Sequence, residues 1–137
     1  MQTLNIINYS LADINKQIFN PINLNIGIVH LGVGSFHRAH QAYFTHKALN
    51  HSIGNWGICG VNLRKEDSKE FDNLKLRKGK YILKTISTSG EEEYKEINSI
   101  IELIDWSRNK EEAEDALSNP DVKLVTMTVT ESCLLYT

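Results

Sequence analysis

Short apolar runs alternate with an amphipathic segment in the first half of the chain. Residues 26–31, "IGIVHL", and 56–63, "WGICGVNL", are short and apolar, which is typical of buried strands. Between them, residues 35–50 carry apolar side chains at helical spacing. This predicts one helix with the following residues on its buried face: Phe36, Ala39, Tyr43, Phe44 and Ala48. Strand, helix and strand form a βαβ unit, whose two strands are parallel.

A polar helix and a hairpin are expected next. The helix covers about 66–77, with Phe71 and Leu74 facing inward. Residues 80–87 and 92–100 are β-rich runs separated by "TSGEE", a link whose glycine favours a hairpin.

The last third of the chain returns to helix and strand. Asn109 and Glu112 have the spacing of a capping box, which predicts a helix that ends before Pro120. Residues 122–129, "VKLVTMTV", are the last strong strand. Alternating strands and helices with one hairpin insertion predict an α/β fold with a mainly parallel sheet, formed as one domain by residues 1–137.

Composition narrows the class of protein. The net charge of −2 gives no electrostatic attraction to nucleic acid or to an anionic membrane. No apolar run approaches the about 18 residues of a membrane helix. The polar, Asn-rich start, where Ser10 and Asp13 could cap a short helix, lacks the features of a secretory signal. Cys59 and Cys133 fit no CxxC pattern and are expected to be free thiols, so we expect a cytoplasmic protein.

The turn after the first strand has the chemistry of a phosphate-binding loop. Gly32 suits a tight turn, and Gly34 suits close approach of backbone to phosphate. Ser35 and Phe36 would offer the unpaired N–H groups of a helix start. His37 stands where the usual fingerprint has a third glycine. The helix must therefore lie farther from the sheet, or turn so that His37 points outward.

In dinucleotide-binding folds, a side chain at the end of the second strand contacts the adenosine ribose. An acidic residue there suits NAD, and an arginine suits the extra phosphate of NADP. In "VNLRKED", Asn62 could bind a ribose hydroxyl and Arg64 could meet a 2′-phosphate. A solvated loop is the alternative for these residues, and the choice between NAD and NADP stays open.

The remaining candidates are histidines and one glutamate. His37 and His40 lie three apart, but no third ligand sits at a recognisable spacing, so no metal site is expected. His30 is expected to be a core histidine. Glu131 follows a strand predicted to be central, at the carboxyl end where open sheets place ligands, with Thr128 and Thr130 beside it. Packing or capping is the alternative for all three residues.

Four stretches in order carry a resemblance: "IVHLGVGSFHRAHQAYFT", "WGICGVNLR", "KYILKT" and "TMTVTE". Together they resemble the amino-terminal domain of the polyol-specific long-chain dehydrogenases, the mannitol dehydrogenase and fructuronate reductase family. The run Gly-x-Gly-x-Phe-His-Arg-Ala-His is the most specific part, and the family keeps no third glycine.

The resemblance implies a Rossmann-like domain that binds NAD or NADP. The reaction it implies is hydride exchange, without metal, with a small molecule, a sugar alcohol or a keto-sugar acid. Residues 28–39, including Val33 and Arg38, would then form the cofactor turn, and Glu131 would lie near the reaction centre. The family's substrate domain, with its catalytic lysine, has no counterpart here, so we expect this chain alone to be inactive. The alternative is a non-catalytic nucleotide-binding or interaction module that self-associates through an uncovered face.

Overall fold

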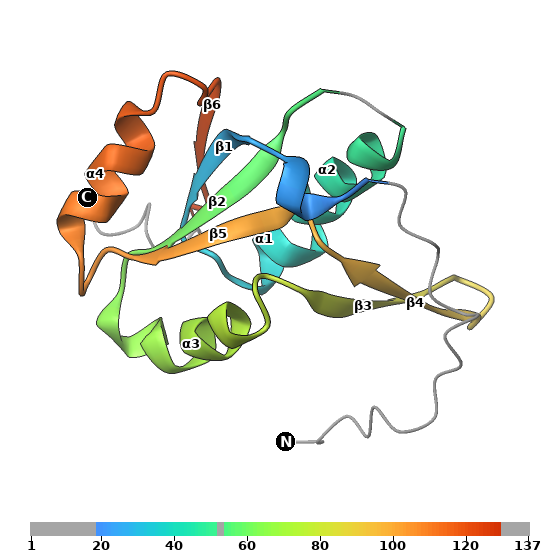
Figure 1. Cartoon of the computed structure of the whole chain (residues 1–137). Coiled ribbons are helices and arrows are strands. Elements are labelled where there is room, and N and C mark those ends of the chain that lie inside the picture. Colours follow the sequence, from blue (N-terminus) through green and yellow to red (C-terminus); the bar gives the residue numbers. More distant parts are fainter. Residues whose placement is uncertain (1–18, 52–53, 130–137) are drawn as a thin grey trace.

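A four-stranded sheet forms the centre of the computed structural model, which describes residues 19–51 and 54–129. Its strands run in the order β5-β2-β1-β6, and every neighbouring pair is parallel (Figure 1). The bounds are Ile26–Leu31 for β1, Gly57–Asn62 for β2, Ile100–Asp105 for β5 and Leu124–Met127 for β6. The mainly parallel α/β fold is therefore confirmed, and so are the three strands expected for this sheet.

Strand β5 was not expected from the sequence. The prediction of one strand over 92–100 is wrong, because β4 ends at Ile97 and β5 begins at Ile100. The two residues between them bind α2: Ser99 Oγ donates to the Ala42 carbonyl at 2.6 Å, and the Asn98 N–H donates to His46 Nδ1 at 3.1 Å. These contacts redirect the chain from the hairpin into the main sheet.

Helices cover both faces of the sheet. Helices α1 (Ser35–Ala39), α2 (Gln41–Asn50) and α3 (Ser68–Leu76) lie on one face, and α4 (Lys110–Ser118) lies on the other. Alternate residues of β1 face the two layers, since Ile28 packs with Ala42 and Phe71 whereas Val29 packs with α4. The inward positions of Phe71 and Leu74 are confirmed.

The single helix predicted over 35–50 is wrong in two respects. The helix breaks at His40, whose φ of −116° and ψ of −89° are not helical. The buried positions are His37, Ala42, His46 and Leu49, whereas Phe36 and Phe44 are 67% and 54% exposed. Tyr43 is partly buried and packs against the core as predicted, but Phe36 and Phe44 do not, and histidines occupy much of the inward face.

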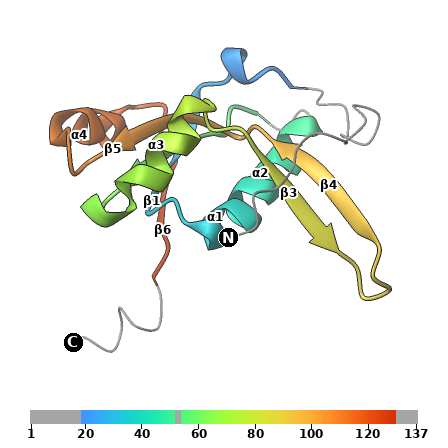
Figure 2. The same ribbon diagram turned by 90° about the horizontal axis from the view of Figure 1, so that it is seen from below.

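The predicted hairpin is confirmed. Strands β3 (Tyr81–Ile86) and β4 (Glu92–Ile97) pair antiparallel and project away from the sheet (Figure 2). Two contacts attach the hairpin to the helical layer. Tyr81 Oη donates to the Arg38 carbonyl at 2.5 Å, and Lys95 Nζ donates to Tyr43 Oη at 3.1 Å.

The predicted start of α4 with Asn109 as its N-cap is confirmed, but the capping box is only half formed, because the Asn109 N–H donates to the Asp105 carbonyl at 2.9 Å. Asn109 Oδ1 accepts from the Glu112 N–H, and Asn109 Nδ2 donates to the Glu112 carboxylate, both at 3.2 Å.

Cys59 is a free, fully buried thiol, and burial raises its pKa to about 12. Ser10, Asp13 and Cys133 lie outside the described residues. Within them, no helix is both long and apolar enough to span a membrane.

Candidate functional site

The glycine turn lies at the carboxyl end of β1, where the connections of the sheet change direction. From β1 the chain continues to β2 on one side, and β6 pairs with β1 on the other. Ligands of open parallel sheets bind at such a switch point. Gly32 makes the turn with a φ of +91°, which only glycine adopts readily, and its N–H donates to the Val61 carbonyl at 2.8 Å.

Gly34 is different, because the fold does not require a glycine there. Its φ of −97° and ψ of −176° are extended and open to any residue. A Cβ built on Gly34 would meet no heavy atom within 4 Å. The backbone at Gly34 is therefore open to close approach from outside, as at the second glycine of a dinucleotide-binding turn.

The first turn of α1 offers donors to that space. The first N–H groups of a helix lack partners within it, and the N-cap Gly34 has no side chain to bind them. The Arg38 guanidinium folds back over the turn, with Nε at 3.4 Å from the Gly34 carbonyl and Nη2 at 3.4 Å from Ser35 Oγ. Backbone donors and a nearby cation together suit an anion.

Val33 holds the turn against the second strand. A Cβ on Gly60 of β2 would lie 2.6 Å from Val33 Cγ2, so the glycine in β2 makes room for this side chain. The turn can therefore pack closely on the sheet because β2 has a glycine, Gly60, opposite Val33, although the turn itself lacks the third glycine of the fingerprint.

The outward orientation considered for His37 is wrong, because its side chain is buried against β1. His37 is 1% exposed, and its ring stacks on that of His30 with centroids 3.6 Å apart. Helix α1 is thus separated from the sheet by the thickness of a flat ring.

The prediction of His30 as a core histidine is confirmed. Its Nε2 lies 3.2 Å from the Gly32 carbonyl and 3.1 Å from Thr128 Oγ1, and its Nδ1 lies 2.7 Å from Thr126 Oγ1. A carbonyl only accepts, so Nε2 carries the proton. Burial lowers the pKa of both histidines, that of His37 to about 3, so the stacked pair is neutral.

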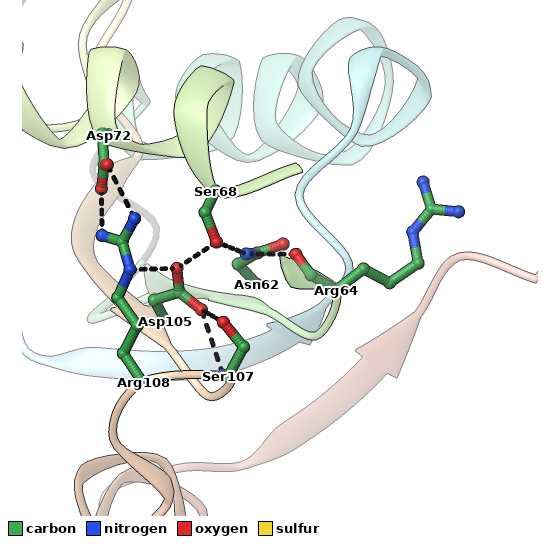
Figure 3. A network of polar contacts seen from close by, with 7 residues as sticks. All are labelled: Asn62, Arg64, Ser68, Asp72, Asp105, Ser107 and Arg108. Carbon is green, nitrogen blue, oxygen red and sulfur yellow. Dashed lines mark hydrogen bonds and ion pairs between the residues drawn. The ribbon is translucent and has the colours of Figure 1, made fainter. Parts of the chain in front are cut away.

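A buried polar network joins the carboxyl ends of β2 and β5 (Figure 3). Asn62 Nδ2 donates to the Arg64 carbonyl at 2.8 Å and lies 3.4 Å from Ser68 Oγ. Ser68 Oγ donates to Asp105 Oδ2 at 2.8 Å, and Ser107 donates to Oδ1 from its hydroxyl at 2.6 Å and its N–H at 3.1 Å. Burial raises the pKa of Asp105, but hydrogen bonds from Ser107, Ser68 and Asn62 outweigh it and lower the net value.

Arg64 points away from this network (Figure 3). Its guanidinium forms a two-point ion pair with Asp67, with Nε–Oδ2 at 2.8 Å and Nη2–Oδ1 at 3.1 Å. Asn62, the last residue of β2, is thus buried, whereas Arg64 in the loop that follows is exposed.

Sequence reasoning missed Ser68 and Asp105 as parts of the site. Asp105 is the last residue of β5, the strand that was not expected, and it would have been a candidate by its place at a strand end.

Thr130 and Glu131 lie outside the described residues. The strand before them, β6, is at the edge of the described sheet, so the expectation of a central strand is wrong there.

The sequence model of one family, described as the mannitol dehydrogenase Rossmann domain, matches residues 26–134. The chain belongs to this family. The part of the chain that the structure describes holds no group of three or more His, Cys, Asp or Glu side chains that could bind a metal.

Individual relatives agree with this membership. D-arabinitol 4-dehydrogenase of Klebsiella pneumoniae is 38% identical over 75% of this chain and 23% of its own length. D-mannonate oxidoreductase of Escherichia coli is 37% identical over 89% of this chain and 26% of its own length. The chain thus spans about a quarter of the length of the curated relatives it matches.

Solved structures show the same architecture. The mannitol 2-dehydrogenase of Pseudomonas fluorescens, in a ternary complex with NAD and D-mannitol, superposes with a TM-score of 0.79 at 35% identity, covering 85% of this chain and 24% of that one. A D-sorbitol dehydrogenase in substrate-free form gives a TM-score of 0.81 at 28% identity, covering 88% and 25%. The Rossmann-like fold is thereby confirmed.

Proposed function

We propose that this chain is the dinucleotide-binding domain, spanning residues 1–137, of an oxidoreductase that uses NAD or NADP and acts on a sugar alcohol or keto-sugar acid. The observation that carries the proposal is Gly34, a glycine that neither its backbone angles nor its neighbours require. Family membership and the NAD complex of the mannitol 2-dehydrogenase from Pseudomonas fluorescens support it.

The turn and the first turn of α1 would hold the diphosphate. Gly32 reverses the chain, Gly34 leaves room, and the N–H groups of Ser35 and Phe36 donate to phosphate oxygens. Arg38, folded over the turn, adds positive charge. The bound nicotinamide supplies the hydride acceptor or donor.

The loop after β2 favours NAD over NADP. Arg64, the residue that could meet a 2′-phosphate, already binds the Asp67 carboxylate at two points. A 2′-phosphate would have to displace or repel that carboxylate, whereas a ribose hydroxyl would not. Asn62, which the network with Ser68 holds in place, would position the loop for the ribose.

The remaining roles rest on the resemblance. Glu131 would lie near the reacting atoms and help to move a proton, and Thr130 would contact the cofactor beside it. We propose the cytoplasm as the location, because Cys59 is a free thiol and reducing compartments keep thiols in that state.

Titration with NADH and NADPH tests the proposal. Trp106 follows β5 at the carboxyl edge and is 37% exposed, so energy transfer from tryptophan to the reduced nicotinamide reports binding. We expect saturable binding that ADP competes away, with NADH bound more tightly than NADPH. We also expect no ordinary turnover with mannitol or fructuronate by this chain alone. Absence of binding of both dinucleotides would contradict the proposal, and full turnover would contradict the need for a further domain.

A second candidate role, an interaction module, has an observation of its own. Strand β6 is at the edge of the described sheet, and Val125, Met127 and Val129 on or beside it are 49%, 61% and 50% exposed. An unpaired edge with apolar side chains favours self-association. Sedimentation of the wild type and of Val125→Lys tests it, since a charged edge should shift the protein to monomer. A wild-type chain that sediments as a monomer at high concentration would exclude this role.

A further inference from the structure

A cavity of about 440 Å³ lies between the α1–α2 layer and strands β1 and β6. It begins where the glycine turn ends, since Phe36 and His37 of α1 line it. None of its lining residues is an acid, a lysine or an arginine; they are His30, Phe36, His37, His40, Gln41, Phe44, Thr45, Thr126, Met127 and Thr128. The cavity therefore offers neutral hydrogen-bonding groups and apolar surface.

His37 has unused hydrogen-bonding capacity at this cavity. Its side chain is 1% exposed, and neither ring nitrogen has a hydrogen-bond partner among the described residues. The Gln41 side chain is close enough to raise the pKa of His37 by a hydrogen-bond interaction, but the geometry gives neither His37 nitrogen a formed hydrogen bond, and Gln41 Oε1 lies 3.0 Å from Thr126 Oγ1 instead. A buried polar group without a partner is unfavourable, so a group from outside the described chain is the natural partner.

The protonation state of His37 sets the chemistry of that partner. Burial is the largest cause of its low pKa, and the neighbouring His30 and Arg38 lower it further. A neutral imidazole has one N–H donor and one acceptor nitrogen. The best partner is therefore an uncharged group that both donates and accepts.

The rim of the cavity suits a ligand with an apolar face. The rings of Phe36 and His40 stack at 5.5 Å, and Phe44 meets His40 edge-on at 5.3 Å. Phe36 and Phe44 are 67% and 54% exposed, although apolar periodicity placed them in the core. Aromatic faces beside a few neutral polar groups are the usual lining of a small-molecule site.

The position of His37 is fixed in advance. Its ring stacks on His30 with the planes inclined by only 9°, and His30 is held from three sides by Thr126, Thr128 and the Gly32 carbonyl. The imidazole therefore loses little freedom when a partner binds, which is the condition for a specific contact.

We propose that this cavity binds an uncharged group that both donates and accepts a hydrogen bond, and that His37 is the residue that pairs with it. Two ligands of the proposed reaction carry such a group: the carboxamide of nicotinamide and a hydroxyl of a sugar alcohol. The inference thus rests on the proposed function for the source of the group. The evidence for it, His37, is separate from the evidence for the diphosphate site, Gly34.

The test compares ligands that contain the group with one that does not. Imidazole nitrogen shifts of His37 are followed by NMR in the wild-type chain during titrations with ADP, nicotinamide mononucleotide and D-mannitol. We expect a ring nitrogen of His37 to shift with nicotinamide mononucleotide or with D-mannitol, and the ligand that acts identifies the source. ADP should leave the His37 signals in place.

Two variants complete the experiment. His37→Phe keeps a flat ring against His30 and removes both nitrogens, and His51→Phe replaces an exposed histidine at the end of α2 as the matched control. We expect His37→Phe to weaken the active ligand by about tenfold or more and to leave ADP affinity within about twofold, with no change for His51→Phe.

The outcomes separate this inference from the proposed function. If the His37 nitrogens respond to neither ligand, the partner is water alone and the inference is wrong, whatever ADP does. If ADP and NADH fail to bind the wild type, the proposed function fails, while a His37 response to D-mannitol would still support the cavity. If His37→Phe does not unfold cooperatively, the variant is not folded, and the NMR titration of the wild-type chain alone tests the inference.

Discussion

Replacing Gly34 separates ligand binding from folding, because nothing in the described protein requires a glycine at this position. The backbone is extended, with a φ of −97°, and an added Cβ meets no heavy atom within 4 Å. We therefore expect Gly34→Ala to leave the free energy of unfolding unchanged, or to raise it by about 0.4–1 kcal/mol because the unfolded chain becomes less free.

The effect of Gly34 variants on binding should be large. The new side chain would stand between the diphosphate and the N–H groups at the start of α1. Losing one charge-assisted hydrogen bond, worth about 1.5–3 kcal/mol, weakens NADH binding by about 10- to 150-fold. Gly34→Val should weaken it at least as much as Gly34→Ala, since its side chain is larger.

Gly90 is the matched control. Its φ of +86° is close to the +91° of Gly32, both positions have open space around a Cβ, and Gly90 lies in the hairpin away from the turn. We expect Gly90→Ala to destabilise the protein by about 1–2 kcal/mol without changing NADH affinity, and Gly32→Ala to change both. Urea denaturation and fluorescence titration measure the two quantities. A Gly34→Val protein that binds NADH like the wild type would refute the assignment of the turn.

Three further outcomes are expected from the buried groups. Asp105→Asn should lower the free energy of unfolding by about 1–3 kcal/mol in urea. Folding lowers the pKa of Asp105, so the extra stability of the wild type should be fully present above the ordinary carboxyl pKa of about 4. It should disappear as the pH falls through the lowered pKa of the folded protein. If Asp105→Asn were equally destabilising at every pH, ionisation of Asp105 would not be the reason for the loss. Tyr81→Phe should cost about 1 kcal/mol through the Arg38 carbonyl it leaves unpaired, whereas Tyr94→Phe, which removes an exposed hydroxyl contact, should cost less. In a Cys133→Ser chain, Cys59 should resist a thiol reagent until the protein unfolds, and rapid labelling of the native protein would show that the β2 core opens.

Most of the candidate site could be proposed from the sequence because its residues are consecutive. The turn from Gly32 to Arg38 is a local feature, in which strand, glycines and helix start follow one another in the sequence. What could not be predicted is the role of partners that are distant along the chain. Asp105 reaches Ser68 across 37 positions, and its strand was hidden because no glycine or proline separates it from the second strand of the hairpin.

The sequence by itself determined the class of fold, the strands β1, β2 and β6, the hairpin and the cap of α4, because each depends on side chains within a few residues of one another. Tertiary structure alone decided which way His37 faces, where the helix breaks and which aromatic residues stay exposed. Burial of His37 depends on His30, which in turn is held by Thr126 of β6 and by Thr128 just after it, 96 and 98 positions away. No local pattern contains that information, since a histidine enters a core only when distant groups hold it there and burial keeps it neutral.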